Sequence, residues 1–264
     1  MPSRRFLPMI LLLGILLIPM ICRAEKPPPP PMPPESLDMN LTTFSELAAA
    51  MSTVEYIPGK PGLLVYGTGR GFVYLYKVYG SRMKPVAETN LWKGIKSVTL
   101  VDMDQDGAPE VVVLTKEAML YVLDREDLTI IWSTEESYFE GISCFTVADM
   151  EDDGQNEIII LADNHLFVFD IGSGYERWKS LVERKATHIV AGDVDGDGMK
   201  ELVLSDGTVL GPRLYEEEWI WDQSFGHRMI LLDMDNDGIL EVVSLDGGGN
   251  LQIVDVDERA RQWK

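Results

Sequence analysis

The sequence predicts an all-β protein made of about five repeated units, each with four short strands. Tryptophan recurs at intervals of 40, 46, 43 and 42 residues, at Trp92, Trp132, Trp178, Trp221 and Trp263. Each interval holds four segments rich in β-branched and aromatic residues, separated by turn residues, and none contains a stretch long enough for a pair of amphipathic helices. Four strands in a period of this length are typical of one blade of a β-propeller, so we expect about five blades over residues 53–264.

Three segments precede the repeats. Residues 1–24 have the basic start, the apolar run and the small residue, Ala24, of a signal peptide. We expect cleavage after Ala24, and the alternative is an uncleaved N-terminal anchor. The proline run in residues 25–36 predicts a stiff, extended spacer. Residues 37–52 predict a short helix, because Thr43 and Glu46 have capping-box spacing. This helix either packs on the repeats or docks another protein.

The second to fifth repeats each carry the acidic motif Asp-x-[Asp/Glu]-x-Asp-Gly-x-x-Glu, directly before an aliphatic segment. Carboxylates alternating on a tight loop, with glycine at the turn, suit a hard divalent cation, and calcium is favoured over magnesium because it accepts more oxygens in flexible geometry. The motif has no histidine or cysteine, which argues against zinc and copper. We expect up to four calcium ions, bound by Asp102, Asp104, Asp106 and Glu110; Asp149, Glu151, Asp153 and Glu157; Asp193, Asp195, Asp197 and Glu201; Asp233, Asp235, Asp237 and Glu241.

The alternative for each motif is a polar hairpin whose acids are merely solvated. Four copies in phase with the repeats argue against this alternative, because clustered like charges repel unless something positive lies between them. The copy at Asp149 is the least regular, since Glu151 stands where the others have aspartate, and we expect weaker binding there.

On these motifs, residues 52–264 resemble the FG-GAP and VCBS-type repeats of integrin α-subunit propellers and of many secreted microbial proteins. The resemblance implies a calcium loop between the first two strands of four blades, on one rim, and ligand binding on the opposite face. Every copy here ends in glutamate at position nine, where integrin-type loops usually have aspartate.

The charge of the chain restricts its partners. It has 43 acidic and 23 basic residues, a formal charge of -20, which argues against nucleic acid and anionic membrane surfaces and fits a protein neutralised by bound cations. A membrane contact is expected only through an uncleaved N-terminal segment. Of the two cysteines, Cys22 lies in the signal, and Cys144 is expected to be a small core residue rather than a reactive thiol.

No residue pattern identifies a catalyst. We therefore expect a binding module, secreted, periplasmic or at the cell surface, whose partner is a protein or a surface glycan. The alternatives are a carbohydrate-active enzyme on a five-bladed propeller and a membrane-tethered assembly factor. Two loops between blades mix aromatic and charged residues as contact surfaces do, and their candidate residues are Tyr138, Phe139, Phe225, His227 and Arg228.

Overall fold

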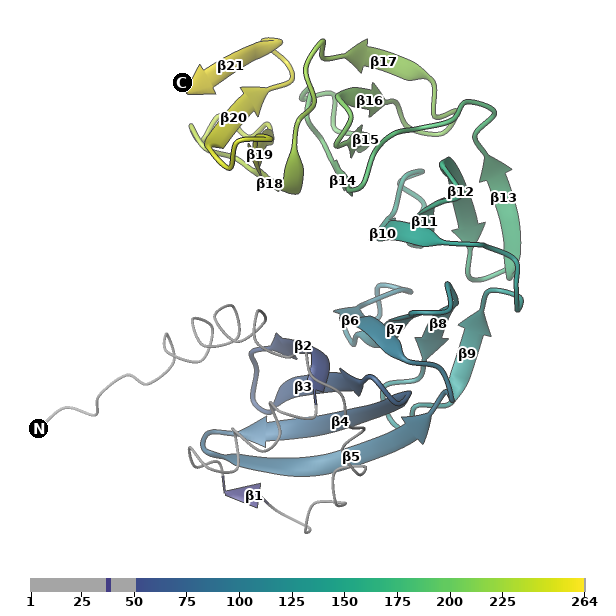
Figure 1. Ribbon diagram of the computed structural model, residues 1–264. Helices are drawn as coiled ribbons and strands as arrows, with labels where there is room; N and C mark the ends of the chain where they lie inside the picture. Colours follow the sequence, from purple (N-terminus) through teal and green to yellow (C-terminus); the bar gives the residue numbers. More distant parts are fainter. Residues whose placement is uncertain (1–36, 39–50, 264) are drawn as a thin grey trace, which may run out of the picture. The chain divides into compact units, whose positions relative to one another are not determined.

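The computed structural model describes residues 37–38 and 51–263, and every regular element among them is a β-strand (Figure 1). Each sheet contains four consecutive antiparallel strands, arranged side by side in their order along the chain. The first sheet has β2 (Met51–Ile57), β3 (Gly62–Thr68), β4 (Phe72–Tyr79) and β5 (Arg82–Asn90), with the two-residue β1 (Leu37–Asp38) added beside β5. The second has β6 (Ile95–Val101), β7 (Glu110–Thr115), β8 (Leu120–Leu123) and β9 (Ile130–Ser133).

The other three sheets repeat this plan. The third has β10 (Ile142–Ala148), β11 (Glu157–Ala162), β12 (His165–Asp170) and β13 (Tyr175–Lys179). The fourth has β14 (Ile189–Gly192), β15 (Glu201–Leu204), β16 (Thr208–Leu210) and β17 (Glu217–Ile220). The fifth has β18 (His227–Leu232), β19 (Glu241–Leu245), β20 (Leu251–Asp255) and β21 (Ala260–Trp263). The all-β prediction with five four-stranded sheets is confirmed.

The predicted N-terminal segments lie largely outside the described residues. Nothing is described of residues 1–36, which include the predicted signal and spacer, or of 39–50, the middle of the predicted helix. The ends of the predicted segment 37–52 are strands, since Leu37–Asp38 forms β1 and β2 begins at Met51. In the part of the chain that is described, no helix is long and apolar enough to cross a membrane.

The core lies between consecutive sheets, because the second strand of each inner sheet is buried on both faces. Val111 and Val113 of β7 pack with the first sheet, whereas Val112 and Leu114, on the opposite face, pack with the third. The same alternation joins the third sheet to the fourth and the fourth to the fifth. Period-two burial on both faces explains why these strands read as nearly continuous aliphatic runs. The first strands also lie side by side, β2 with β6, β10 with β14 and β14 with β18.

The fourth strand of each acidic sheet carries a β-bulge next to its tryptophan. Val122 opposes Trp132 while Leu123 opposes Ile130, so one residue of β9 is left unpaired. The unpaired residue, called here the bulge residue, precedes the tryptophan and is Ile131, Arg177, Glu218 and Gln262 in the second to fifth sheets. A bulge bends its strand and re-aims a side chain.

This register corrects the tryptophan repeat. Trp219, opposite Val209, is the counterpart of Trp132 and Trp178, so the choice of Trp221 was wrong. Trp132, Trp178 and Trp219 pack against the clusters between sheets, whereas Trp92 is 87% exposed.

Candidate metal sites: four acidic loops

Each acidic motif forms the loop between the first and second strands of its sheet. The four loops span residues 102–109, 149–156, 193–200 and 233–240, which join β6 to β7, β10 to β11, β14 to β15 and β18 to β19. The loop position expected from the repeat pattern is therefore the observed one. The first sheet has no such loop, in agreement with its sequence.

The first aspartate organises the backbone of each loop by accepting hydrogen bonds from amides three to five residues on. In the second sheet, Asp102 accepts from Asp106 N (3.1 Å) and Gly107 N (2.8 Å), and the loop of the third sheet repeats both bonds. The loops of the fourth and fifth sheets keep the bond from the amide five residues on, and their other bond comes from the amide three residues on. The sixth residue is a glycine with positive φ in every loop, at Gly107 (88°), Gly154 (86°), Gly198 (87°) and Gly238 (95°). The sequence thus encodes one loop conformation four times.

The ninth residue, a glutamate, closes each loop from the first position of the second strand. Its carboxylate accepts a hydrogen bond from the backbone amide at position two of the same motif. The four bonds are Glu110 from Met103 N (2.9 Å), Glu157 from Met150 N (3.0 Å), Glu201 from Val194 N (3.0 Å) and Glu241 from Met234 N (2.6 Å). Glu157, Glu201 and Glu241 are at most 2% exposed. Burial raises the pKa of all four carboxyls, so their charge is costly without a counterion.

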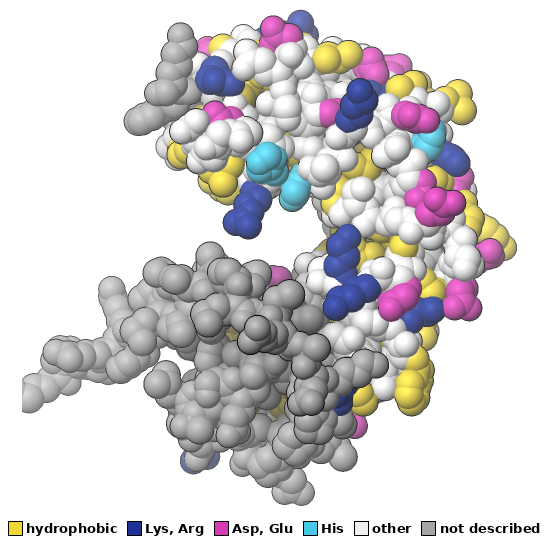
Figure 2. Space-filling view, in the orientation of Figure 1, with side chains coloured by type: hydrophobic (Ala, Val, Ile, Leu, Met, Phe, Trp, Pro, Cys, Tyr) yellow, Lys and Arg dark blue, Asp and Glu magenta, His cyan; other side chains and the backbone are white. Residues whose placement is uncertain are grey.

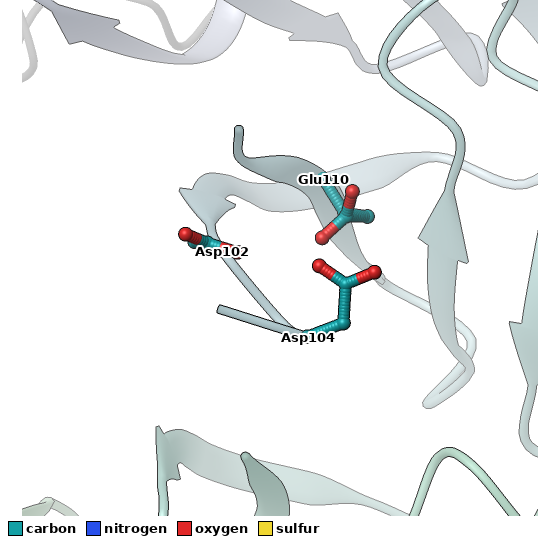
Figure 3. A group of neighbouring side chains, drawn as sticks. All are labelled: Asp102, Asp104 and Glu110. Carbon is teal, nitrogen blue, oxygen red and sulfur yellow. The ribbon is translucent and has the colours of Figure 1, made fainter. Parts of the chain in front are cut away.

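Three of the loops gather carboxylates closely enough to share one cation. Oxygen atoms of Asp102, Asp104 and Glu110 lie within 4.8 Å of one another, as do those of Asp233, Asp235 and Glu241. Figure 3 shows the carboxylates of Asp104 and Glu110 directed toward each other across the loop that begins with Asp102. In the fourth sheet two such groups share Asp195: one with Asp193 and Asp197, the other with Glu201 and Glu218.

Each loop is numbered here after its sheet, from the second (residues 102–109) to the fifth (residues 233–240). Arginines neutralise the second and third loops in part. Arg125, in the turn between β8 and β9, lies 3.1 Å from Asp106 and 3.8 Å from Glu110. Arg177, the bulge residue of β13, pairs closely with Glu151 and lies 3.5 Å from Glu157. The predicted ligands of the third loop are not brought together as a group of three, and this is the loop with the irregular Glu151.

The fourth loop differs, because its bulge residue is Glu218 rather than a base. No described basic residue forms an ion pair with Asp195, Glu201 or Glu218. Burial raises the pKa of Glu201 to about 7; the amide of Val194 opposes the shift, and the charges of Asp195 and Glu218 add to it. Oxygen donors alone, in this number, are the ligand chemistry of a hard divalent cation such as calcium.

Sequence reasoning missed Arg125, Arg177 and Glu218, although each bears on the charge of a loop. Arg177 and Glu218 lie far along the chain from the loops they approach, and only the strand register brings them there. A signal was present in the residue before each tryptophan, which changes from Ile131 to Arg177 to Glu218 while its surroundings repeat.

The four loops form a row in which each is hydrogen-bonded to the next. Asn156 of the third loop donates to Asp102 O (2.7 Å) and Met103 O (3.2 Å) of the second. Lys200 Nζ of the fourth loop donates to Asp149 O (3.1 Å), and Leu240 N of the fifth donates to Asp193 O (3.1 Å). The loops therefore meet at the boundaries between sheets.

Two of the predicted contact residues belong to the core instead. Phe139 (4% exposed) and Phe225 (0%) are buried in the clusters between sheets, because the connections after β9 and β17 turn their aromatic rings inward. Tyr138, partly exposed, packs edge-on against Phe139, while His227 and Arg228 are exposed at the start of β18.

Burial raises the pKa of Cys144 to about 12, as expected for a structural thiol.

The comparisons with known proteins agree with the fold. No protein-family model and no curated protein matches the chain. The chain is similar in structure to the Neurospora crassa Pan2 WD40 domain (15% identity, TM-score 0.53, 81% of this chain and 65% of that one). It is also similar to Saccharomyces cerevisiae Sqt1 (11% identity, TM-score 0.59, 76% and 57%) and to BBS1N, crystallised in complex with ARL6DN (13%, 0.53, 81% and 67%).

These similarities define the class: the described chain has a β-propeller fold. It spans less than two thirds of the Pan2 domain and of the Sqt1 chain. At these identities the likeness concerns the fold, and the acidic loops have to be interpreted from their own geometry.

Proposed function

We propose that the chain is a calcium-stabilised β-propeller that works outside the cytosol as a protein-binding module. The observation that carries the calcium part is the fourfold repetition of one loop, with the same glycine conformation and the same closing glutamate. Repulsion among its carboxylates has no structural purpose unless a cation joins them. Sites of this kind in extracellular modules have Kd values of about 0.1–1 mM, so they fill outside the cytosol.

The calcium is structural in this proposal. A cation that binds only the folded state stabilises it by RT ln(1 + [L]/Kd), about 1.4 kcal/mol per site at tenfold excess over Kd. The loops lie at the boundaries between sheets, where a bound ion holds a sheet in place and relieves the charge of its neighbours.

The face opposite the acidic loops is the proposed binding surface. Because neighbouring strands are antiparallel, the connections between sheets lie at the other end from the loops. His188 precedes β14, and His227 and Arg228 begin β18, which lies beside β14. Burial lowers the pKa of His188, and the charges of His227 and Arg228 add to that effect. Figure 2 shows histidine and Lys/Arg side chains on the displayed face of the described chain, with Asp and Glu side chains on the same face. A local group of two histidines and an arginine on so acidic a chain suits an acidic segment of a partner protein.

Calcium is tested by a thermal melt of residues 25–264 in chelator and across a calcium titration. We expect calcium to raise Tm, and the rise to shrink when Asp193, Asp195 and Asp197 are changed to asparagine. An unchanged Tm at millimolar calcium would mean that the loops bind no calcium of structural importance.

Binding is tested by affinity capture from envelope extract in calcium, with Arg228→Glu as the variant and Arg213→Glu as the matched control. Arg213 is exposed in the turn between β16 and β17, at the end of the sheet that carries the acidic loops. We expect Arg228→Glu alone to lose the captured proteins. If both variants capture what the wild type does, the proposed surface is wrong.

A further inference from the structure

In the third and fourth sheets, the bulge residue decides which charge lies over the acidic loop. In the third and fourth sheets it stands in the same register, one residue before Trp178 or Trp219 and opposite the end of the third strand. In the third sheet this residue is Arg177, whose guanidinium reaches Glu151 and Glu157. The chain itself thus supplies the positive charge of the third loop.

In the fourth sheet the same position supplies a carboxylate. Oxygens of Glu218, Asp195 and Glu201 lie within 4.8 Å of one another, although Glu218 belongs to the outer strand and not to the motif. The three side chains line a pocket of ≈ 340 Å³, together with Trp219 and with Asp257 and Arg259 from the turn before β21. The pocket therefore lies at the boundary of the fourth and fifth sheets.

A buried oxygen in this pocket lacks a partner. Glu201 is 1% exposed, and while its Oε2 accepts the hydrogen bond from Val194 N, its Oε1 has no hydrogen-bond partner. A buried carboxylate oxygen without a partner carries a large desolvation cost, which a bound cation would remove.

The neighbouring strand makes room for Glu218. The second, third and fifth sheets have an aspartate at the end of the third strand, Asp124, Asp170 and Asp255, whereas the fourth has Gly211. A Cβ at Gly211 would lie 2.1 Å from Glu218 Oε1, so only glycine allows this position of the carboxylate. Loss of one carboxylate at the third strand accompanies gain of another at the bulge.

We propose that Glu218, Asp195 and Glu201 form a divalent-cation site between the fourth and fifth sheets, and that this site binds calcium more tightly than the third loop. This inference rests on the calcium binding proposed above, to which it adds a ligand from outside the motif. Affinity for calcium rises with the number of charged ligands, which here come from the acidic loop, from β15 and from β17.

The test measures calcium binding by titration calorimetry and Tb³⁺ luminescence, on the wild type, Glu218→Gln and Glu216→Gln. Glu216 is an exposed acid in the adjoining turn, so its variant has the same change of charge near the site. Trp219 lines the pocket and sensitises Tb³⁺ bound there, and Trp219→Phe identifies that emission.

We expect Glu218→Gln to weaken one site at least about tenfold and to reduce the Trp219-sensitised emission, while Glu216→Gln changes neither. Glu218→Gln should also raise Tm in chelator, because it relieves repulsion, so weaker binding cannot be attributed to misfolding. If the wild type binds calcium and Glu218→Gln binds it equally well, this inference is wrong and the proposed function stands. If the wild type binds no calcium, both fail.

Discussion

The third and fourth acidic loops have similar backbones, but the outer strand places a positive charge beside the third loop and a negative charge beside the fourth. Both are organised by the first aspartate and closed by a buried glutamate. In the third, Arg177 pairs with Glu151 and Glu157, whereas in the fourth, Glu218 joins Asp195 and Glu201. The loop motif therefore fixes the backbone, and a residue of the outer strand sets the charge that remains for a cation.

The largest effect is expected from removing calcium altogether. If the second, fourth and fifth loops are occupied at tenfold excess over Kd, mass action contributes about 4 kcal/mol, and chelator lowers Tm by about 10 °C. Calorimetric melts in calcium and in chelator measure this difference. Variants that remove the carboxylates of one loop at a time show which loop carries this loss of Tm. If only the third-loop variant removes the effect of calcium, the third loop and not the fourth is the one that binds calcium.

The second prediction exchanges the two bulge residues. Arg177→Glu leaves the buried Glu157 without its arginine, which costs about 1–3 kcal/mol in chelator, and it lets the third loop bind an additional calcium ion. Glu218→Arg has the opposite result: one ion fewer and less sensitivity to chelator. Calorimetric stoichiometry and Tm follow both changes.

The control for this exchange is Lys185→Glu, which reverses a charge in the exposed connection between the third and fourth sheets. We expect it to leave the number of bound ions unchanged. Equal stoichiometry in Arg177→Glu and the wild type would show that the bulge residue does not control the third loop.

The third prediction concerns pH in the absence of calcium. Burial raises the pKa of Glu201 to about 7 in the folded chain, well above the usual value of a glutamate. The folded state therefore holds the proton more tightly, and the stability gained from protonation is present at pH 5 and is lost as pH rises through 7. We expect Tm in chelator to fall between pH 5 and pH 7, to level off above pH 7, and to fall less in Glu201→Gln. An identical pH profile for the variant would assign the effect to other groups.

The smallest effect is expected from Gly211→Ala. The new Cβ displaces the Glu218 carboxylate, so calcium affinity of the fourth loop should fall severalfold with little change of Tm in chelator. Gly247→Ala is the matched control, because a Cβ there has no neighbour within 4 Å. Unchanged affinity in Gly211→Ala would mean that the position of Glu218 over Gly211 is not required for binding.

Local patterns predicted most of the fold. Strand periodicity and glycine placement gave five four-stranded sheets and the position of the acidic loops, because both depend on residues close in sequence. The bulges were not predictable in this way: two tryptophans two residues apart, Trp219 and Trp221, look equivalent until the pairing with Val209 is known.

The candidate sites were predicted only in part for the same reason. Of the sixteen motif residues, the twelve at positions one, three and five lie on the loops, and the four glutamates begin the strands that follow. Arg177 and Glu218 act through strand pairing, which sequence spacing does not reveal. Phe139 and Phe225 also resembled contact residues by composition, and their burial depends on how consecutive sheets pack.

The hydrogen bonds between neighbouring loops have a kinetic consequence. Asn156 N and Leu240 N each donate across a boundary between sheets, to carbonyl oxygens of Met103 and Asp193. Each amide is shielded only while the two sheets stay together, so separation of that pair lets it exchange with deuterated solvent even when both sheets remain folded. The exchange rates of these two protons therefore report on two boundaries separately: Asn156 N on that of the second and third sheets, and Leu240 N on that of the fourth and fifth.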